Sequence, residues 1–193
     1  KNIKSWQTLT SDEREKKVTI QDLVKAGLRN FPKWMLVSET RGAEAGDMLD
    51  SAKTGHSIIT TLHATGAMDI PSRLMSMIRQ SASYSQVSDQ IIGKEVTKFL
   101  RYGIHLEAHL EEQGIVRRIK EIVEFTDFTE KGAVGKYLYR KKNVYNEKTG
   151  EYELVEEFGE LSDETLSFIH DRKLYHFLPD VFKPKENRKA VLV

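Results

Sequence analysis

Polar side chains that could do chemistry lie at the ends of two short strand-like segments of this sequence. They are Glu39, Thr60, Thr61 and His63. The two segments are residues 34–37 and 57–62, and ligands of open α/β sheets bind beyond the carboxyl ends of the strands. If the two strands are parallel neighbours, a carboxylate, two hydroxyl groups and an imidazole meet in one crevice. That combination predicts the hydrolytic half of a nucleotide-triphosphatase site.

The expected roles follow from the chemistry of phosphoryl transfer, which depends on positioning water and balancing charge. Glu39 could polarise the attacking water or hold a water molecule of Mg²⁺. Thr61 and His63 could hydrogen-bond the γ-phosphate region, with Thr60 beside them as a nucleotide-binding group. Arg41 could reach a phosphate through its planar guanidinium. We therefore expect Glu39, Arg41, Thr61 and His63 to be catalytic.

Structural roles remain open for several of these residues. Arg41 could equally pair with a neighbouring acid. His56, in the turn before the second strand, could brace the nucleotide site or be a hydrogen-bonded turn histidine. A zinc site of His56 and His63 is not expected, because they lie on different elements and no His-Glu-x-x-His pattern occurs. His105 and His109 alternate with apolar residues, which predicts surface positions.

The phosphate-binding half of such a site is not found in the sequence. No Gly-x-x-x-x-Gly-Lys-[Ser/Thr] segment occurs, and the glycines are scattered singly. The chain begins at Lys1 without an initiator methionine. We therefore expect a C-terminal portion of a longer protein whose upstream part carries the phosphate loop. On this interpretation the chain alone does not hydrolyse ATP.

Composition narrows the class of protein. Of the 193 residues 31% are charged and 39% hydrophobic, which suits a globular protein. The formal net charge of +1 gives no overall field that would attract nucleic acid or anionic lipid. No apolar run approaches the roughly 18 residues of a membrane-spanning helix. The absence of cysteine excludes disulfide bonds and thiolate metal sites. The basic clusters 117–118 and 140–142 read as solvated hairpin faces, so no direct nucleic-acid binding is expected.

Strands and helices alternate in the first part of the chain, which predicts an α/β fold with a parallel sheet. The expected elements are a helix at 19–29 capped by Thr19, a buried strand at 34–37, a helix at 43–53, a strand at 57–62 and a helix at 72–80. The buried side of the second helix should consist of Ala45, Met48, Leu49 and Ala52. Gly55 should end that helix.

From about Gly103 the pattern changes to alternating strands. The expected hairpins are 104–110 with 115–123 through the turn 111–114, and 137–145 with 152–158 through the turn 146–150. Ser162 should cap a last helix that reaches His170. The tail 183–188 is charged and expected to be loose.

Two segments resemble the Walker B and histidine boxes of the secretion ATPase superfamily, the motors of type II and type IV secretion and of type IV and Tad pilus assembly. The first family pattern is Leu-Arg, a nearby Pro, a hydrophobic strand and Gly-Glu-x-Arg-[Asp/Gly]. It is matched here by Leu28-Arg29, Pro32, residues 34–37 and Ser38-Glu39-Thr40-Arg41-Gly42. The second pattern is matched by Thr54-Gly55-His56 and Thr61-Leu62-His63-Ala64. The resemblance covers about residues 15–125, and Lys33 and Ser38 depart from it where an acidic residue and a glycine are usual.

The resemblance implies the C-terminal part of a RecA-like ATPase domain at residues 1–130, with a hairpin and helical appendage at 131–193. It also implies ATP and Mg²⁺ as cofactors, with Glu39 reaching the metal through water, and a homo-hexamer in the complete protein. The implied partners are inner-membrane secretion or pilus platform proteins, at the cytoplasmic face of the membrane.

We therefore predict part of an ATP-hydrolysing motor for type IV secretion, conjugation or Tad-type pilus assembly. The alternative is a non-catalytic assembly or interaction domain of a secretion complex, with no phosphate loop upstream. A third hypothesis is a DNA-handling ATPase. It would require a strongly salt-dependent affinity for DNA, which the near-neutral net charge of the chain does not favour.

Overall fold

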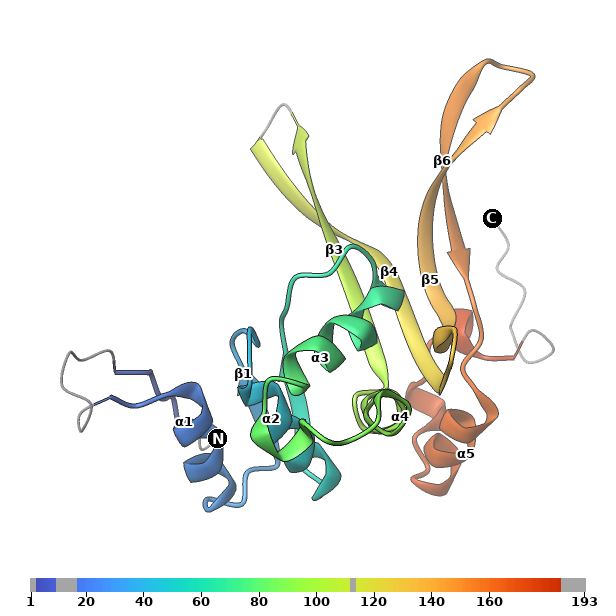
Figure 1. Cartoon of the computed structure of the whole chain (residues 1–193). Helices are drawn as coiled ribbons and strands as arrows, with labels where there is room; N and C mark the ends of the chain where they lie inside the picture. Colours follow the sequence, from blue (N-terminus) through green and yellow to red (C-terminus); the bar gives the residue numbers. More distant parts are fainter. Residues whose placement is uncertain (1–2, 10–16, 112–113, 185–193) are drawn as a thin grey trace. The chain divides into compact units, whose positions relative to one another are not determined.

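The computed structural model describes residues 3–9, 17–111 and 114–184 (Figure 1). The chain forms two compact units, one of residues 1–63 and 71–100 and the other of residues 64–70 and 101–193. Helices and strands mix along the chain, so the predicted α/β class is confirmed. The predicted domain boundary after residue 130 falls in the turn between two paired strands of the second unit, and the division into domains stays a prediction.

The first unit contains the helices and a pair of short strands. Its elements are α1 (Ile20–Leu28), β1 (Trp34–Val37), α2 (Glu44–Lys53), β2 (Ser57–Thr60), most of α3 (Ile70–Ile78) and α4 (Asp89–Phe99). α4 was not expected from the sequence, although Ser88 caps it and Ile92 and Val96 form its buried side. The predicted cap of α1 is confirmed, because the Thr19 hydroxyl accepts the Asp22 N–H at 3.2 Å.

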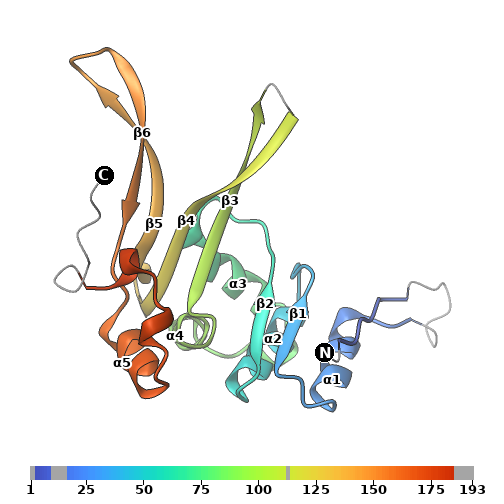
Figure 2. The same cartoon turned by 180° about the vertical axis from the view of Figure 1, so that it is seen from behind.

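β1 and β2 are parallel neighbours, as predicted, with Trp34 opposite Ser57 and Val37 opposite Thr60 (Figure 2). α2 lies between them in the chain and packs against β2. Its predicted buried side is confirmed, since Ala45, Met48, Leu49 and Ala52 are all buried. Gly55 ends the helix with a φ of 95°, a left-handed backbone that favours glycine.

The prediction that β1 is buried along its whole length was wrong. Met35 is buried, but Trp34 is 52% exposed and Leu36 is 74% exposed. Side chains alternate between the two faces of a strand, so one face of β1 is covered and the other is not covered by the described residues. A continuous apolar run indicates a strand that two layers can cover, but it does not supply the second layer.

The second unit is built on one antiparallel sheet in the order β3-β4-β5-β6 (Figure 1). Its elements are β3 (Tyr102–Glu111), β4 (Gly114–Thr129), β5 (Gly132–Asn146), β6 (Glu151–Phe158) and α5 (Asp163–Asp171). Both predicted hairpins are confirmed, and β4 also pairs with β5, which joins them into one sheet. Gly114 has the expected positive φ, 114°. The rest of the predicted first turn, Glu112 and Gln113, and the tail from residue 185 lie outside the described residues.

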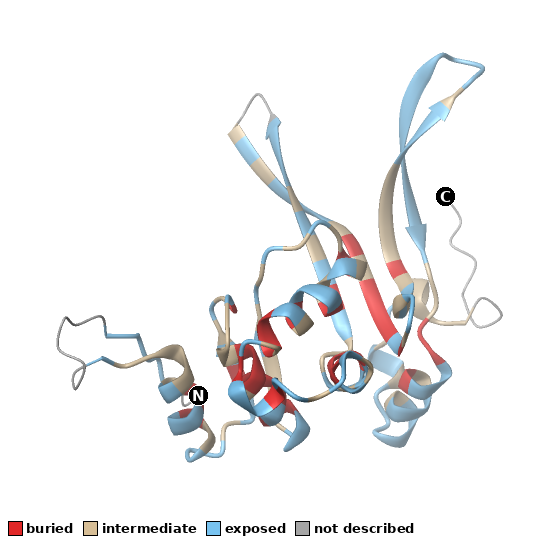
Figure 3. Ribbon diagram, in the orientation of Figure 1, coloured by how far each residue is buried: buried red, intermediate tan, exposed pale blue. Residues whose placement is uncertain are grey.

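The β3–β4 hairpin does not follow the usual rule of apolar residues inside. Leu106 is 58% exposed, whereas the side chain of His105 is only 20% exposed. The predicted surface position of His105 was therefore wrong, and that of His109, 51% exposed, is confirmed. Buried residues of the sheet are concentrated on β4, where Val123 and Phe125 form a core with Ala67 (Figure 3).

Within the described residues, no helix is long and apolar enough to cross a membrane.

Candidate functional site

The carboxyl ends of β1 and β2 are held together beyond the last strand pair. The backbone N–H of Thr40 donates to the carbonyl of Thr61 at 2.9 Å, and the Thr61 hydroxyl donates to the carbonyl of Ser38 at 2.5 Å. These bonds fix the two segments that carry the predicted site residues. The predicted convergence of Glu39, Thr60, Thr61 and His63 at one edge of the strand pair is therefore present in the structure.

Glu39 lies between two basic side chains at this edge. Its Oε2 is 2.5 Å from Arg41 Nη2, and its Oε1 is 3.4 Å from His63 Nε2. The Glu39 side chain is 26% exposed, whereas those of Arg41 and His63 are 75% and 92% exposed. The hydrogen bond from Arg41 lowers the pKa of the Glu39 carboxyl, partial burial opposes that shift, and the charges of Arg41 and His63 add to it. Glu39 is therefore an ionised hydrogen-bond acceptor at neutral pH, and its partners face solvent.

A buried threonine that sequence reasoning did not single out braces this edge. The Thr40 side chain is buried, and its hydroxyl lies 2.7 Å from the hydroxyl of Thr60 and 3.5 Å from Met48 Sδ. Thr40 is thus packed inward, while the side chain of the preceding Glu39 remains 26% exposed. The signal was available in the sequence, since Thr40 directly follows Glu39.

Glu44, also missed by sequence reasoning, closes the loop between β1 and α2. Its Oε1 accepts the backbone N–H groups of Arg41 at 2.7 Å and Gly42 at 3.0 Å. Both N–H groups belong to the loop before α2, and Ala43 at the N-cap offers no side-chain hydrogen bond to the helix. Glu44 thereby fixes the backbone that presents Arg41 to Glu39.

His56 does not join this cluster. It precedes β2, whereas His63 follows it, so the four residues of β2 separate them at about 3.3 Å per residue. The ring Nδ1 of His56 lies 3.1 Å from the Thr54 hydroxyl and 3.3 Å from the Ser51 carbonyl. These contacts tie His56 to the end of α2, and its predicted part in nucleotide binding stays a prediction.

The donor set at the strand ends suits a partly hydrated cation better than a fully protein-bound one. Within residues 3–9, 17–111 and 114–184, no group of three or more His, Cys, Asp or Glu side chains could hold a metal ion. Mg²⁺ commonly keeps several waters and binds one or two carboxylates together with substrate phosphates. The Glu39 carboxylate fits such a water-mediated contact.

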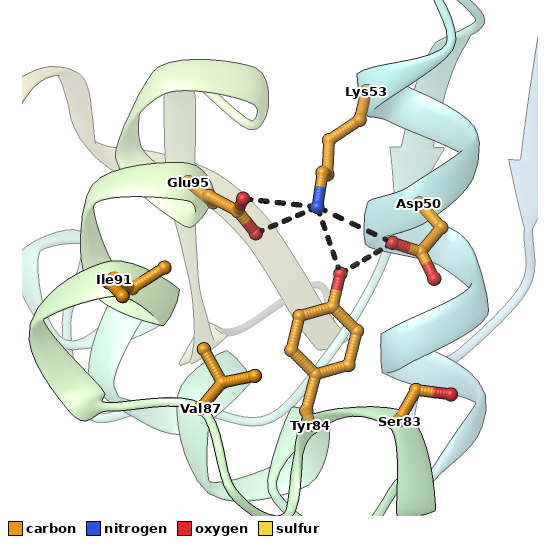
Figure 4. A pocket seen from close by; sticks show the side chains of 7 residues that line it. All are labelled: Asp50, Lys53, Ser83, Tyr84, Val87, Ile91 and Glu95. Atoms are coloured by element: carbon orange, nitrogen blue, oxygen red, sulfur yellow. Dashed lines mark hydrogen bonds and ion pairs between the residues drawn. The ribbon is translucent and has the colours of Figure 1, made fainter.

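A second polar cluster lies at the other end of α2, in a cavity of about 320 Å³ between α2 and α4 (Figure 4). Lys53 Nζ is 3.0 Å from the Glu95 carboxylate and 3.6 Å from Asp50, and the Tyr84 hydroxyl donates to Asp50 at 2.5 Å. Burial, followed by the bond to Asp50, raises the pKa of Tyr84. Each of these four side chains forms a hydrogen bond or ion pair with another of them, so we interpret the cluster as a structural link between the helices.

The chain is similar to proteins of secretion systems. A family model described as type II/IV secretion system protein matches residues 2–149. An uncharacterized protein of Bacillus anthracis is 27% identical over an alignment of 182 residues, and the match covers 85% of this chain and 39% of that protein. A putative conjugal transfer protein of Mycobacterium tuberculosis is 34% identical over 77 residues, covering 37% of this chain and 22% of that protein.

One solved structure adds a likeness of fold. The VirB11 ATPase of the Brucella suis type IV secretion system, determined in complex with sulphate, matches 55% of this chain at a TM-score of 0.51 and 30% identity. The match covers 32% of the VirB11 chain. The chain thus spans well under half the length of the proteins it resembles.

Proposed function

The chain belongs to the family of type II/IV secretion system proteins, and we propose that it supplies the water-orienting half of an ATP-hydrolysing motor. The motor would drive a secretion, conjugation or Tad-type pilus-assembly machine. The phosphate loop that completes the site would come from residues beyond this chain, for which the longer relatives leave room.

The observation that carries this proposal is the position of Glu39 at the end of a parallel strand pair, 3.4 Å from His63 and 2.5 Å from Arg41. An ionised carboxylate at that point can accept a hydrogen bond from the attacking water and orient it. A lowered pKa makes Glu39 a poor proton acceptor, which favours orientation of water over full proton abstraction.

The neighbouring groups suit a charged phosphate. His63 is exposed on the side of Glu39, and its ring N–H can donate to the γ-phosphate region. Arg41 can leave Glu39 for a phosphate oxygen, because its guanidinium binds carboxylate and phosphate with the same planar geometry. Thr60 and Thr61 hold the strand ends in place and keep acceptor capacity toward a ligand. Bound Mg²⁺ would supply neutralisation of phosphate charge, with Glu39 contacting one of its waters.

We further propose that the complete protein is a homo-hexamer on the cytoplasmic side of the membrane, docked on inner-membrane secretion or pilus platform proteins. Closed rings of this kind use one repeated contact that pairs two different surfaces of adjacent subunits. Direct binding of nucleic acid is not part of the proposal, because the basic cluster 140–142 of β5 is paired with glutamates of the neighbouring strands: Arg140 with Glu121, Lys141 with Glu156 and Lys142 with Glu157.

Glu39→Gln in the complete protein tests the proposed function. Glutamine keeps the size of the side chain and loses its charge. Turnover of Mg·ATP should therefore fall at least about a hundredfold, the lower range for a positioned acid–base group, while ATP binding is retained. Glu107→Gln is the matched control, since Glu107 is also an ion-paired carboxylate but lies on β3, and it should leave turnover unchanged.

The chain by itself should show no turnover, because its 193 residues contain no phosphate loop. Near-normal hydrolysis by the Glu39→Gln protein would remove Glu39 from the site and contradict the proposal.

A further inference from the structure

The segment that follows His63 is anchored on the four-stranded sheet by a buried glutamate. The backbone N–H of Ala67 donates to Glu121 Oε2 at 2.9 Å, and this bond joins residues 54 positions apart. Ala67 itself is completely buried and packs with Val123 and Phe125 of β4. The anchor therefore combines a charge-assisted hydrogen bond with an apolar contact.

Glu121 is held on both sides by basic groups of the neighbouring strands. Its side chain is only 8% exposed, Arg140 Nε of β5 lies 3.3 Å from its Oε1, and His105 Nδ1 of β3 lies 3.9 Å from its Oε2. A buried carboxylate is costly unless it is paired and hydrogen-bonded. Glu121 meets both conditions, because it pairs with Arg140 and accepts a hydrogen bond from Ala67 in the segment after His63.

The segment approaches the sheet closely at two glycines. A Cβ on Gly66 would meet Glu121 Oε2 at 3.3 Å. A Cβ on Gly103 of β3 would meet Phe125 Cζ at 2.8 Å and the Ala67 carbonyl at 3.2 Å. The backbone around Ala67 is thus fitted against β3 and β4 and is not a loosely lying loop.

His63 depends on its backbone for its position, because its side chain is 92% exposed. On one side the chain is fixed at Thr61, whose carbonyl accepts the Thr40 N–H. On the other side the next fixed point is Ala67, with only residues 64–66 between it and His63. A change in the position of Ala67 therefore reaches His63 through a short connection.

We propose that Glu121 is a positioning residue that couples His63 to the four-stranded sheet through the Ala67 backbone amide. The proposal rests on the proposed function, since it assigns His63 to the nucleotide site. A movement of His63 with the state of the γ-phosphate would then be transmitted to β3, β4 and β5. Conversely, release of Ala67 would leave His63 less well placed for hydrolysis.

Hydrogen exchange of this chain tests the anchor. Glu121→Ala should speed exchange of the Ala67 amide at least about tenfold, the effect of losing a hydrogen bond to a charged group. Glu121→Gln should speed it less, because the amide oxygen still accepts the Ala67 N–H. Glu107→Ala removes another ion-paired carboxylate of the same sheet and should leave Ala67 unchanged. Wild-type exchange of Ala67 in Glu121→Ala would overturn the anchor.

Steady-state kinetics of the complete protein test the coupling. Glu121→Ala should lower kcat about tenfold with KM within about twofold, because misplacement of a group by about 1 Å can cost up to a hundredfold. Glu121→Gln should recover most of kcat, and Glu107→Ala should be normal. If Glu121→Ala does not fold, Glu121→Gln decides through its smaller loss, because its amide oxygen accepts the Ala67 N–H without the charge. Ala67 exchange about twofold faster together with a kcat about twofold lower supports the proposal, and wild-type values for both overturn it.

The two proposals fail in different ways. A released Ala67 amide together with a normal kcat overturns the coupling and leaves the nucleotide site untouched. Normal turnover in Glu39→Gln instead overturns the proposed function, and with it the role given to His63.

Discussion

Two glutamates, one in each unit, show how differently the same side chain is used. Glu124 on β4 is fully buried and accepts hydrogen bonds from the Ser162 N–H at 2.8 Å, from the Ser162 hydroxyl at 2.6 Å and from the Thr165 hydroxyl. Glu39 instead has two basic partners that are largely exposed. The donors to Glu124 are fixed by the first turn of α5, whereas Arg41 and His63 can exchange Glu39 for a ligand. The exposure of its partners, as well as its own burial, therefore separates a structural carboxylate from a candidate catalytic one.

Of the substitutions at the two glutamates, Glu124→Ala should change the free energy of unfolding most. It leaves the buried N–H and hydroxyl donors of Ser162 without their acceptor, so the free energy of unfolding should fall by about 3 kcal/mol. Glu39→Ala should change it by less than about 0.5 kcal/mol, as at other surface sites. Denaturant unfolding of the chain measures both. Equal losses for the two variants would break the distinction between the two carboxylates.

Local elements were predictable because their signals are local. The cap of α1 by Thr19 and the turn glycines Gly55 and Gly114 follow from short-range backbone requirements, and the structure contains them. Burial was less predictable, because it depends on what covers each face. The run Trp34–Val37 predicted a strand correctly but not the open face of that strand. His105 lies inward, opposite Glu121 across the strand pair, and the alternation of the sequence did not indicate this.

The candidate site was predictable where parallel strands bring their carboxyl ends together. Glu39, Thr60, Thr61 and His63 meet for that reason. The residues that support the site could not be predicted from the sequence. The role of Glu44 depends on the path of the loop, and the role of Glu121 depends on a contact with a residue 54 positions away.

Arg41→Ala should have a smaller effect, confined to the pKa of the Glu39 carboxyl. Arg41 is the main cause of the lowered pKa of Glu39, so its loss should raise that pKa toward the ordinary value of 4.5. With a lowered folded-state pKa, the charge of Glu39 favours the fold above its unfolded pKa, and this contribution is lost as pH falls through the folded pKa. NMR titration of the Glu39 carboxyl carbon measures the shift.

Lys120→Ala is the matched control for this titration. It should raise the pKa of Glu107, which Lys120 lowers, and leave that of Glu39 in place. An unchanged Glu39 titration in Arg41→Ala would show that the Arg41–Glu39 pair does not form in solution.

We propose that nucleotide binds at the carboxyl end of β2, where His63 lies, and not at the end that carries His56. Turnover of His63→Ala and His56→Ala in the complete protein, each per folded molecule, tests it most directly. We expect a loss of about tenfold or more for His63→Ala, equivalent to at least ~1.4 kcal/mol of transition-state stabilisation, with little change in melting temperature. His56→Ala should stay within about twofold of wild type, since its ring Nδ1 is hydrogen-bonded to the Thr54 hydroxyl and the Ser51 carbonyl at the end of α2. An equal or larger loss in His56→Ala, or normal turnover in His63→Ala, would contradict the account.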